Sequence, residues 1–199
     1  MDYEDSTLSV YDKNALDYHS RLASDFQKSE RDKFIKLMPL DPHVLDLGCG
    51  TGRDALAFQD QGFDILAVDG ATGMINLAQK FGVKNTRVLK YSQLDTLNCT
   101  FDGIWASYSL LHLSKSDLPK VIKNIKHLLK SPGIFYASFR QGDGEELRTN
   151  DRYGGGRFFA YYTEAELKRI FSEFFRNVTI QKITGVDPRG GLAVWVVKE

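Results

Sequence analysis

The stretch His43-Val44-Leu45-Asp46-Leu47-Gly48-Cys49-Gly50-Thr51-Gly52-Arg53-Asp54-Ala55 decides how the rest of the chain is interpreted. Its apolar start ends in a carboxylate and three alternating glycines, which predicts a buried strand, a tight turn and the start of a helix. Glycine is needed where the backbone passes close to a ligand, because a Cβ would collide there. The helix expected over residues 54–59 would point its free N–H groups at the same place. The stretch therefore predicts a ligand-binding turn.

Two kinds of ligand suit such a turn. Dinucleotide enzymes carry G-x-G-x-x-G, and Arg53 stands where the third glycine of that pattern should be, which disfavours an NAD(P)-dependent oxidoreductase. The string Val-Leu-Asp-Leu-Gly-Cys-Gly-Thr-Gly over residues 44–52 instead resembles the first motif of the class I S-adenosylmethionine (SAM)-dependent methyltransferases. The resemblance implies SAM as cofactor. It also implies an α/β fold, a Rossmann-like seven-stranded, mostly parallel sheet with an antiparallel last strand and helices on both faces.

The bulk properties agree with one globular domain. The chain has 199 residues with 26 basic and 26 acidic side chains, so no net charge would hold it on nucleic acid or on an anionic membrane. The two cysteines, Cys49 and Cys99, indicate neither a disulfide framework nor a zinc site, and we expect no metal. The polar N-terminus is unlike a signal peptide, so a cytoplasmic location is expected. The oligomeric state stays open.

The order of the expected elements extends the resemblance from about residue 40 to the end. Strands are expected over residues 44–47, 64–68, 86–89, 101–107 and 133–139, and the last two, 178–184 and 192–197, as a hairpin. Helices are expected over 11–18, 20–38 and 116–130, and after a capping box formed by Thr163 and Glu166. Residues 141–162 are expected to be an irregular loop. We divide the chain into a helical lid segment, 1–38, and a methyltransferase domain, 39–199.

The end of the second strand carries a candidate ribose ligand. Asp69 lies 21 residues after Gly48, and a carboxylate there can accept hydrogen bonds from both hydroxyls of a ribose. The resemblance implies that Met74 packs against adenine, although a core methionine is an equal alternative. It places Tyr18 and Arg21 near the SAM carboxylate, and Arg21 is alternatively a solvated helix residue. The full set of expected cofactor-binding residues is Tyr18, Arg21, Asp46, Gly48, Cys49, Gly50, Arg53, Asp69, Gly70, Met74, Ser92, Gln93 and Ser107, in which Ser92 and Gln93 replace an acidic residue that the family commonly has after the third strand.

The run Phe101-Asp102-Gly103-Ile104-Trp105-Ala106-Ser107-Tyr108-Ser109-Leu110-Leu111-His112 resembles the fourth motif of the same family. The resemblance implies that Ser107 lines the methionine part of the pocket and that Tyr108 and His112 face the methyl group or the acceptor. Tyr108, His112 and Tyr18 are the candidate catalytic residues. His112 is either a base or a structural hydrogen-bonding group. Tyr11 and Tyr18 share a helix face that either closes the pocket or only packs on the domain.

The acceptor is expected to be a small molecule, because the chain carries no obvious module for RNA or protein recognition. Tyr11, Tyr108, Arg140 and Arg157 are the candidate acceptor-binding residues, and Arg140, Arg152 and Arg157 suit a carboxylate or phosphate. A polar loop with exposed arginines is the alternative for this region. Methylation of protein or RNA, and a SAM-binding subunit without catalysis, remain as alternative functions.

Overall fold

A computed structural model describes residues 3–21, 25–150, 152–184 and 190–199. Its helices are α1 (Tyr3–Ser20), α2 (Lys28–Leu37), α3 (Arg53–Asp60), α4 (Thr72–Lys80), α5 (Leu118–Leu128) and α6 (Glu164–Ser172), with two 3-10 helices, η1 (Tyr91–Thr96) and η2 (Leu110–His112). Its strands are β1 (His43–Leu47), β2 (Asp64–Asp69), β3 (Thr86–Val88), β4 (Phe101–Ala106), β5 (Leu129–Arg140), β6 (Glu145–Arg148), β7 (Arg157–Ala160), β8 (Asn177–Ile183) and β9 (Gly191–Lys198).

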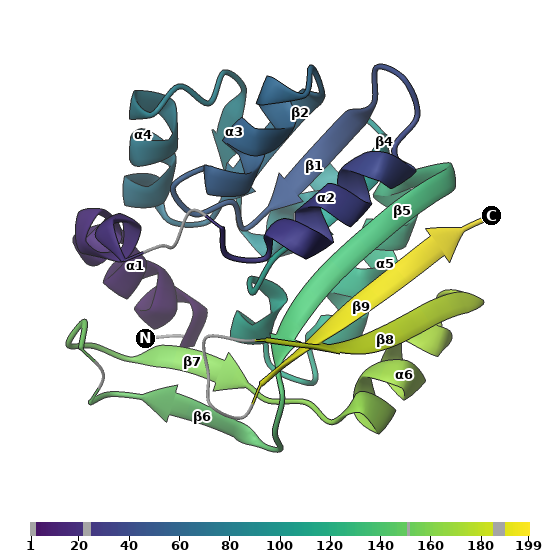
Figure 1. The fold of residues 1–199 in the computed structure, drawn as a ribbon. Helices are drawn as coiled ribbons and strands as arrows, with labels where there is room; N and C mark the ends of the chain where they lie inside the picture. The colour runs from purple at the N-terminus through teal and green to yellow at the C-terminus, as the bar shows by residue number, and fades with distance from the viewer. Residues whose placement is uncertain (1–2, 22–24, 151, 185–189) are drawn as a thin grey trace.

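The seven-stranded sheet has the order β3-β2-β1-β4-β5-β9-β8 (Figure 1). Its pairs from β3 to β5 are parallel, and β9 runs antiparallel to both β5 and β8. The expected fold class and the expected C-terminal hairpin are therefore confirmed. The residues predicted to link β8 and β9, including Asp187, Pro188 and Arg189, lie outside the described part of the chain.

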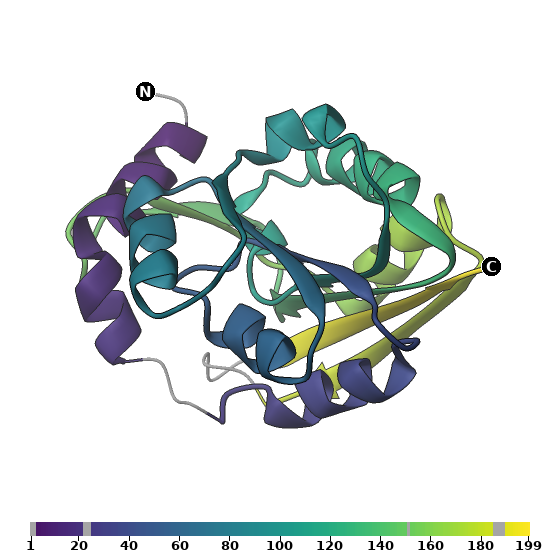
Figure 2. The same cartoon turned by 90° about the horizontal axis from the view of Figure 1, so that it is seen from above.

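Helices cover both faces of this sheet (Figure 2). On one face α5 and α6 bury the apolar residues that their periodicity predicts, such as Val121, Ile122 and Ile125 of α5. On the other face Phe34 of α2 and Phe58 of α3 pack around Trp105 of β4, with ring centroids 5.2 and 5.5 Å from it. Burial of such rings supplies much of the stability of a domain of this size.

The sheet has one topological switch point, between β1 and β4. The chain proceeds from β1 outward to β2 and β3, and then crosses to β4 on the other side of β1. In doubly wound sheets this crossing leaves a crevice at the carboxyl ends of the two central strands. The glycine turn after Leu47 and the segment after Ala106 meet there, which places the predicted ligand-binding turn at the expected edge of the sheet.

Two expectations about the elements outside the sheet are wrong. The predicted single helix over 20–38 is not continuous, because α1 already runs from Tyr3 to Ser20 and α2 begins only at Lys28. The predicted loop over 141–162 contains a hairpin in which β6 pairs with β7 in a separate two-stranded sheet. This hairpin lies beside α1 (Figure 1), so the two contact each other across the mouth of the crevice. The domain division at residue 38 stays a prediction, and α2 packs directly on the sheet.

Candidate functional site

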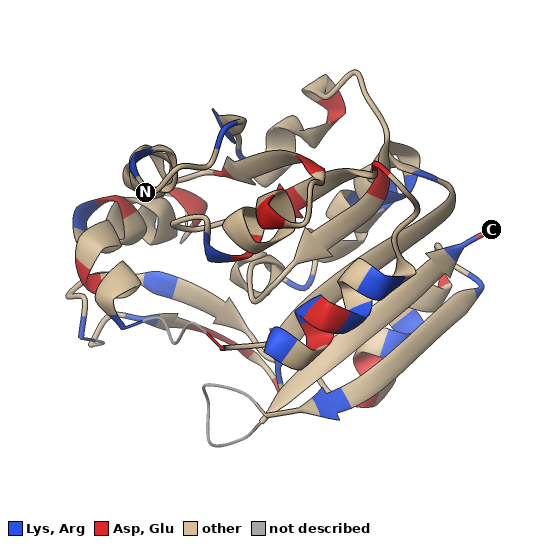
Figure 3. Ribbon diagram, turned by 45° about the horizontal axis from the view of Figure 1, so that its top comes forward, with Lys and Arg blue, Asp and Glu red and all other residues tan. Residues whose placement is uncertain are grey.

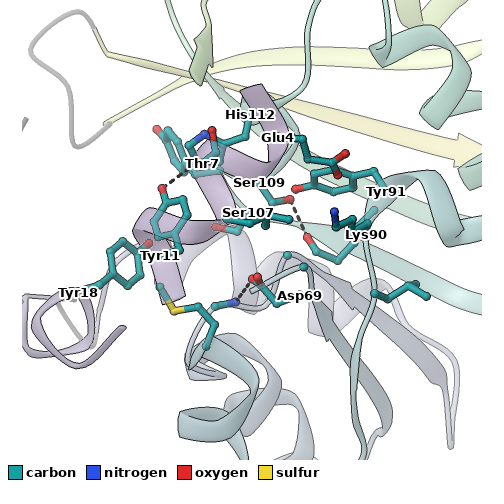
Figure 4. Close-up of a pocket in the computed structure, with 18 residues that line it drawn as sticks. Glu4, Thr7, Tyr11, Tyr18, Asp69, Lys90, Tyr91, Ser107, Ser109 and His112 are labelled. Atoms are coloured by element: carbon teal, nitrogen blue, oxygen red, sulfur yellow. Dashed lines mark hydrogen bonds between the residues drawn. The ribbon is translucent and has the colours of Figure 1, made fainter. Parts of the chain in front are cut away.

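A cavity lies at the switch point, and the space free of atoms in it and at its open mouth is about 710 Å³. Many predicted site residues line it, namely Tyr11, Tyr18, Gly48, Gly50, Asp69, Gly70, Met74, Ser107, Tyr108 and His112 (Figure 4). Sequence reasoning missed other lining residues, namely Glu4, Thr7, Leu8, Leu47, Leu89, Lys90, Tyr91 and Ser109. The missed residues of α1 gave little signal, because Glu4 and Thr7 are polar and form no apolar stripe with Leu8.

The three glycines of the turn have different roles. A Cβ on Gly48 would lie 2.3 Å from the Cβ of Ser109, and one on Gly52 would lie 2.5 Å from Val83. Both glycines are therefore required by packing, and both adopt a positive φ that favours glycine. A Cβ on Gly50 would find only the ring of Tyr18, at 3.9 Å, so this glycine leaves its space to the cavity.

Asp69 ends β2 at the wall of the cavity. One carboxylate oxygen accepts from the backbone N–H of Gly50 at 2.9 Å, and the other accepts from that of Ala71 at 2.8 Å. Burial raises the pKa of Asp69 to about 6, although these two backbone donors oppose the shift. Each oxygen keeps further lone pairs, so the carboxylate can accept hydrogen bonds from two neighbouring hydroxyl groups.

A smaller cavity, with about 340 Å³ of empty space, lies beneath the glycine turn and shares Tyr18, Gly48, Gly50 and Ser107 with the larger one. Asp46, Cys49 and Arg53 line it as well. Among the residues that the structure describes, Oδ2 of Asp46 and Nη1 of Arg53 are buried without a hydrogen-bond partner. Burial raises the pKa of Asp46 well above its ordinary value, and the charge of Asp54 adds to the shift. A buried acceptor and a buried donor side by side match the ammonium and carboxylate of an amino acid.

Arg53 is held rigidly for such a role. Its Nε and Nη2 atoms donate to the two carboxylate oxygens of Asp54, at 3.0 and 2.8 Å. Arg31 of α2 donates to the same carboxylate at 2.7 Å, and Trp105 donates to it at 2.9 Å. Asp54 therefore orients the guanidinium and leaves Nη1 for a ligand.

His112 is held in one neutral form. Its Nδ1 lies 2.7 Å from the carbonyl oxygen of Phe158, which can only accept, so Nδ1 carries the proton. Its Nε2 therefore accepts from the hydroxyl of Tyr11, at 2.8 Å, and that hydroxyl accepts from Arg157 at 3.2 Å. Burial lowers the pKa of His112 to about 3, which keeps the ring neutral.

Several predicted site residues lie away from the cavity. Arg21 is exposed and pairs with Asp17 on the preceding turn of α1, with 2.9 Å between Nη2 and Oδ1. Ser92 and Gln93 are exposed, because η1 turns them outward, and Gln93 accepts from the backbone N–H of Lys90. None of these three residues lines either cavity, and their contact with the cofactor stays a prediction.

The two predicted acceptor arginines lie behind the cavity wall. The guanidinium of Arg140 is 4.4 Å from the ring centroid of Phe159, and Arg157 is buried between the rings of Tyr11 and Tyr153. Neither lines the cavity directly, but both lower the pKa of His112 through their charge. Arg152, the third arginine of the predicted anion site, is exposed. The charges of Arg140 and Arg157 therefore reach the part of the cavity around His112, whose lining also includes the acidic Glu4 and Asp69.

Helix α1 forms one wall of the cavity and is fixed at both sides. Toward the β2 side, Asp12 accepts from the backbone N–H of Gly73 at 2.6 Å, at the N-terminus of α4. Toward the hairpin, Thr7 accepts from the backbone N–H of Phe158 at 2.9 Å. A Cβ on Gly70 would lie 2.7 Å from Leu8, so α1 approaches the end of β2 closely. The helix thus bridges the two halves of the crevice.

Comparison with known proteins gives the same assignment as the motifs. Residues 44–133 match the family model described as a methyltransferase domain. The chain is 26% identical over 185 residues to a carboxy-S-adenosyl-L-methionine synthase of Campylobacter curvus, which covers 87% of this chain and 74% of that protein. It is 28% identical over 153 residues to a glycine/sarcosine N-methyltransferase of Halorhodospira halochloris, covering 72% of this chain and 55% of that relative, little more than half its length.

A solved structure is similar over almost the whole chain. It is the 1,6-didemethyltoxoflavin-N1-methyltransferase of Burkholderia thailandensis, with 1,6-didemethyltoxoflavin and S-adenosylhomocysteine bound. The TM-score is 0.73 at 25% sequence identity, and the match covers 98% of this chain and 86% of the other. The cofactor product in that structure has a ribose and an amino-acid end, the two groups for which Asp69 and the Asp46–Arg53 pair have suitable hydrogen-bonding atoms. On the motifs, the topology and these matches, residues 44–133 match a methyltransferase domain and the whole chain is similar to the class I SAM-dependent methyltransferases.

Proposed function

We propose that this enzyme transfers the methyl group of SAM to a small-molecule acceptor. The observation that carries the proposal is the wall formed by α1, because it leaves a recessed crevice rather than a flat surface for a macromolecule. The named activities of the glycine/sarcosine and didemethyltoxoflavin enzymes, both small-molecule methyltransferases, support it.

The proposed cofactor contacts follow the chemistry of the two cavities. Asp69 would accept from the ribose hydroxyls, and Gly70 and Met74 would pack beside the adenosine. Asp46 and Arg53 would hold the amino-acid end, below the glycine turn. SAM supplies an electrophilic methyl group on its sulfonium, so the protein has chiefly to position the acceptor and exclude water.

The acceptor would lie against Tyr11, Tyr18 and Tyr108. Burial raises the pKa of Tyr18, so its hydroxyl stays protonated and can donate a hydrogen bond to the acceptor. We propose that Arg140 and Arg157 act on the acceptor at a distance, through their positive charges. These charges favour a carboxylate or phosphate over a cation. His112 would hold Tyr11 through their hydrogen bond and thereby keep α1 in place over the crevice.

Two alternatives make different predictions. A protein or RNA acceptor would favour a surface of one sign near the crevice, whereas acidic and basic residues are interspersed over the elements in Figure 3. A SAM-binding subunit without catalysis would bind the cofactor and methylate nothing. None of the described helices has the length and apolar character of a membrane span. We also propose a cytoplasmic location, because the thiols of Cys49 and Cys99 are both free.

The test has two stages. Thermal melting with SAM, S-adenosylhomocysteine, NAD or NADP should show stabilisation by the first two only, about 2.7 kcal/mol at a hundredfold excess over Kd. Incubation with methyl-labelled SAM should then transfer label to one member of a panel of small carboxylates, phosphates, amines and phenols. Label that enters only peptides or RNA would refute the small-molecule assignment. Binding without transfer to any acceptor class would favour the non-catalytic alternative.

A further inference from the structure

We propose that Gln27 is a positioning residue that makes the Ser107 hydroxyl an obligate hydrogen-bond acceptor toward the cofactor. Gln27 lies directly before α2 and is only 7% exposed, so its amide needs partners inside the protein. No sequence motif points to it. The inference rests on the proposed function in one respect, the placement of the amino-acid end of the cofactor beside Ser107.

The amide of Gln27 joins the ends of two strands. Its Oε1 accepts from the hydroxyl of Ser107, after β4, and from the hydroxyl of Ser138 in β5, the latter at 3.4 Å. Its Nε2 donates to the hydroxyl of Tyr136 at 3.0 Å. The side chain thus reaches from the N-terminal segment to the edge of the sheet where the cavities meet.

The direction of these bonds determines what Ser107 can offer a ligand. A serine hydroxyl has one proton, and Ser107 gives that proton to Gln27. Only oxygen lone pairs of Ser107 remain for the two cavities that it lines. A lone pair beside the unpartnered Oδ2 of Asp46 suits an ammonium group, which has three donors and no acceptor.

The same network fixes the neighbouring tyrosine. Ser138 accepts from the backbone N–H of Tyr108 at 2.9 Å while it donates to Gln27. Tyr108 has a φ of 50°, a left-handed conformation that is rare for a residue with a side chain and persists only where the surroundings hold it. Phe26, next to Gln27, packs 5.5 Å from the Tyr108 ring. Phe26 and Gln27 thus support two residues of the proposed site. These are Ser107, beside the cofactor, and Tyr108, on the acceptor side.

A pair of ligands separates this role from a merely structural one. S-Adenosylhomocysteine has the amino-acid end, and 5′-methylthioadenosine lacks it. Gln27→Met keeps the length of the side chain and removes the acceptor, so the Ser107 proton is released. We expect the Kd for S-adenosylhomocysteine to rise about five- to tenfold by titration calorimetry, the equivalent of one hydrogen bond, and the Kd for 5′-methylthioadenosine to stay within about twofold.

Matched variants complete the test. Gln27→Glu keeps acceptor oxygens for both serines and should retain the wild-type preference for S-adenosylhomocysteine. Ser107→Ala should lose that preference, and adding Gln27→Met to it should cause no further loss. Equal weakening of both ligands by Gln27→Met, or an unchanged preference in Ser107→Ala, would overturn the proposal, and the second result does so even if Gln27→Met fails to fold. A wild-type protein that binds neither ligand would overturn the proposed function, and this inference with it.

Discussion

The raised pKa of Asp69 predicts that cofactor affinity depends on pH. Hydroxyl groups that donate to Asp69 stabilise its ionised form, whereas burial without a ligand raises its pKa to about 6. At pH 5 a carboxyl group with that pKa is ionised in about one molecule in ten, and at pH 7 in about nine of ten. If only the ionised form binds well, the Kd for S-adenosylhomocysteine should rise about tenfold between pH 7 and pH 5.

Calorimetry can measure both the affinity and the proton that accompanies binding. Binding fixes Asp69 in its ionised form, so about half a proton should be released per ligand at pH 6, visible as a dependence of the heat on the buffer. His112 does not titrate in this interval, because its pKa is about 3. The contribution of Asp69 to the free energy of unfolding changes with pH in the opposite direction. A carboxyl group with a raised pKa in the folded state stabilises the fold below its unfolded pKa, and this stabilisation is lost as the pH rises through 6.

The control variant is Asp69→Asn. An amide cannot ionise and can accept through only one atom, whereas the carboxylate accepts from both Gly50 and Ala71. The variant should therefore bind S-adenosylhomocysteine more weakly at pH 7 and show a smaller change in Kd down to pH 5, since only the contribution of Asp46, whose pKa burial also raises, is left. A wild-type Kd that stays constant within about twofold from pH 7 to pH 5 would refute the assignment of Asp69 to the cofactor hydroxyls. An identical pH profile in both proteins would refute it equally.

Three further changes test the turn, the lid and the histidine. Gly48→Ala would place a Cβ 2.3 Å from Ser109 and should lower the free energy of unfolding in urea by about 3 kcal/mol, whereas Gly62→Ala, with the same sign of φ and open space, should lower it by about 1 kcal/mol. Asp12→Ala removes the carboxylate at the N-terminus of α4, so S-adenosylhomocysteine should dissociate about two- to fivefold faster in stopped-flow experiments, and an unchanged rate would exclude a lid role for this contact. The ring nitrogens of His112 should show the neutral Nδ1–H form by NMR from pH 5 to pH 8, and a titration within that range would contradict its burial.

The sheet and its ligand-binding edge could be predicted because their signals are local. The run Val44–Leu47 with its glycines, and the run from Phe101 to Ala106, each predict one strand, and the rule for crossings places them side by side. Asp69 follows from the same reasoning, since the end of a neighbouring strand is fixed once the order is known. The positions of residues that depend only on the strand ends could therefore be predicted from the sequence.

The residues that sequence reasoning missed depend on contacts between distant segments. Gln27 bonds residues 80, 109 and 111 positions away, and nothing in the sequence around it indicates those partners. Helix α1 packs through Leu8 and Tyr11 but also through the smaller Thr7 and Ala15, so no continuous apolar stripe indicates its full length. The outward direction of Ser92 and Gln93 was missed for a related reason, because the 3-10 turn that exposes them leaves no clear pattern in the sequence.

The contacts of His112 limit how an acceptor can lose a proton. Its Nδ1 proton is held by the carbonyl of Phe158, and its Nε2 is occupied by Tyr11, so the ring can accept a proton only after Tyr11 leaves. Tyr11 lies on α1 and also accepts from Arg157, so its departure would loosen the wall that encloses the crevice. A base role for His112 would thus conflict with the exclusion of water during transfer. An acceptor that is already nucleophilic, such as a carboxylate, has no proton to lose and avoids this conflict, and the positive charges of Arg140 and Arg157 near His112 favour the same class.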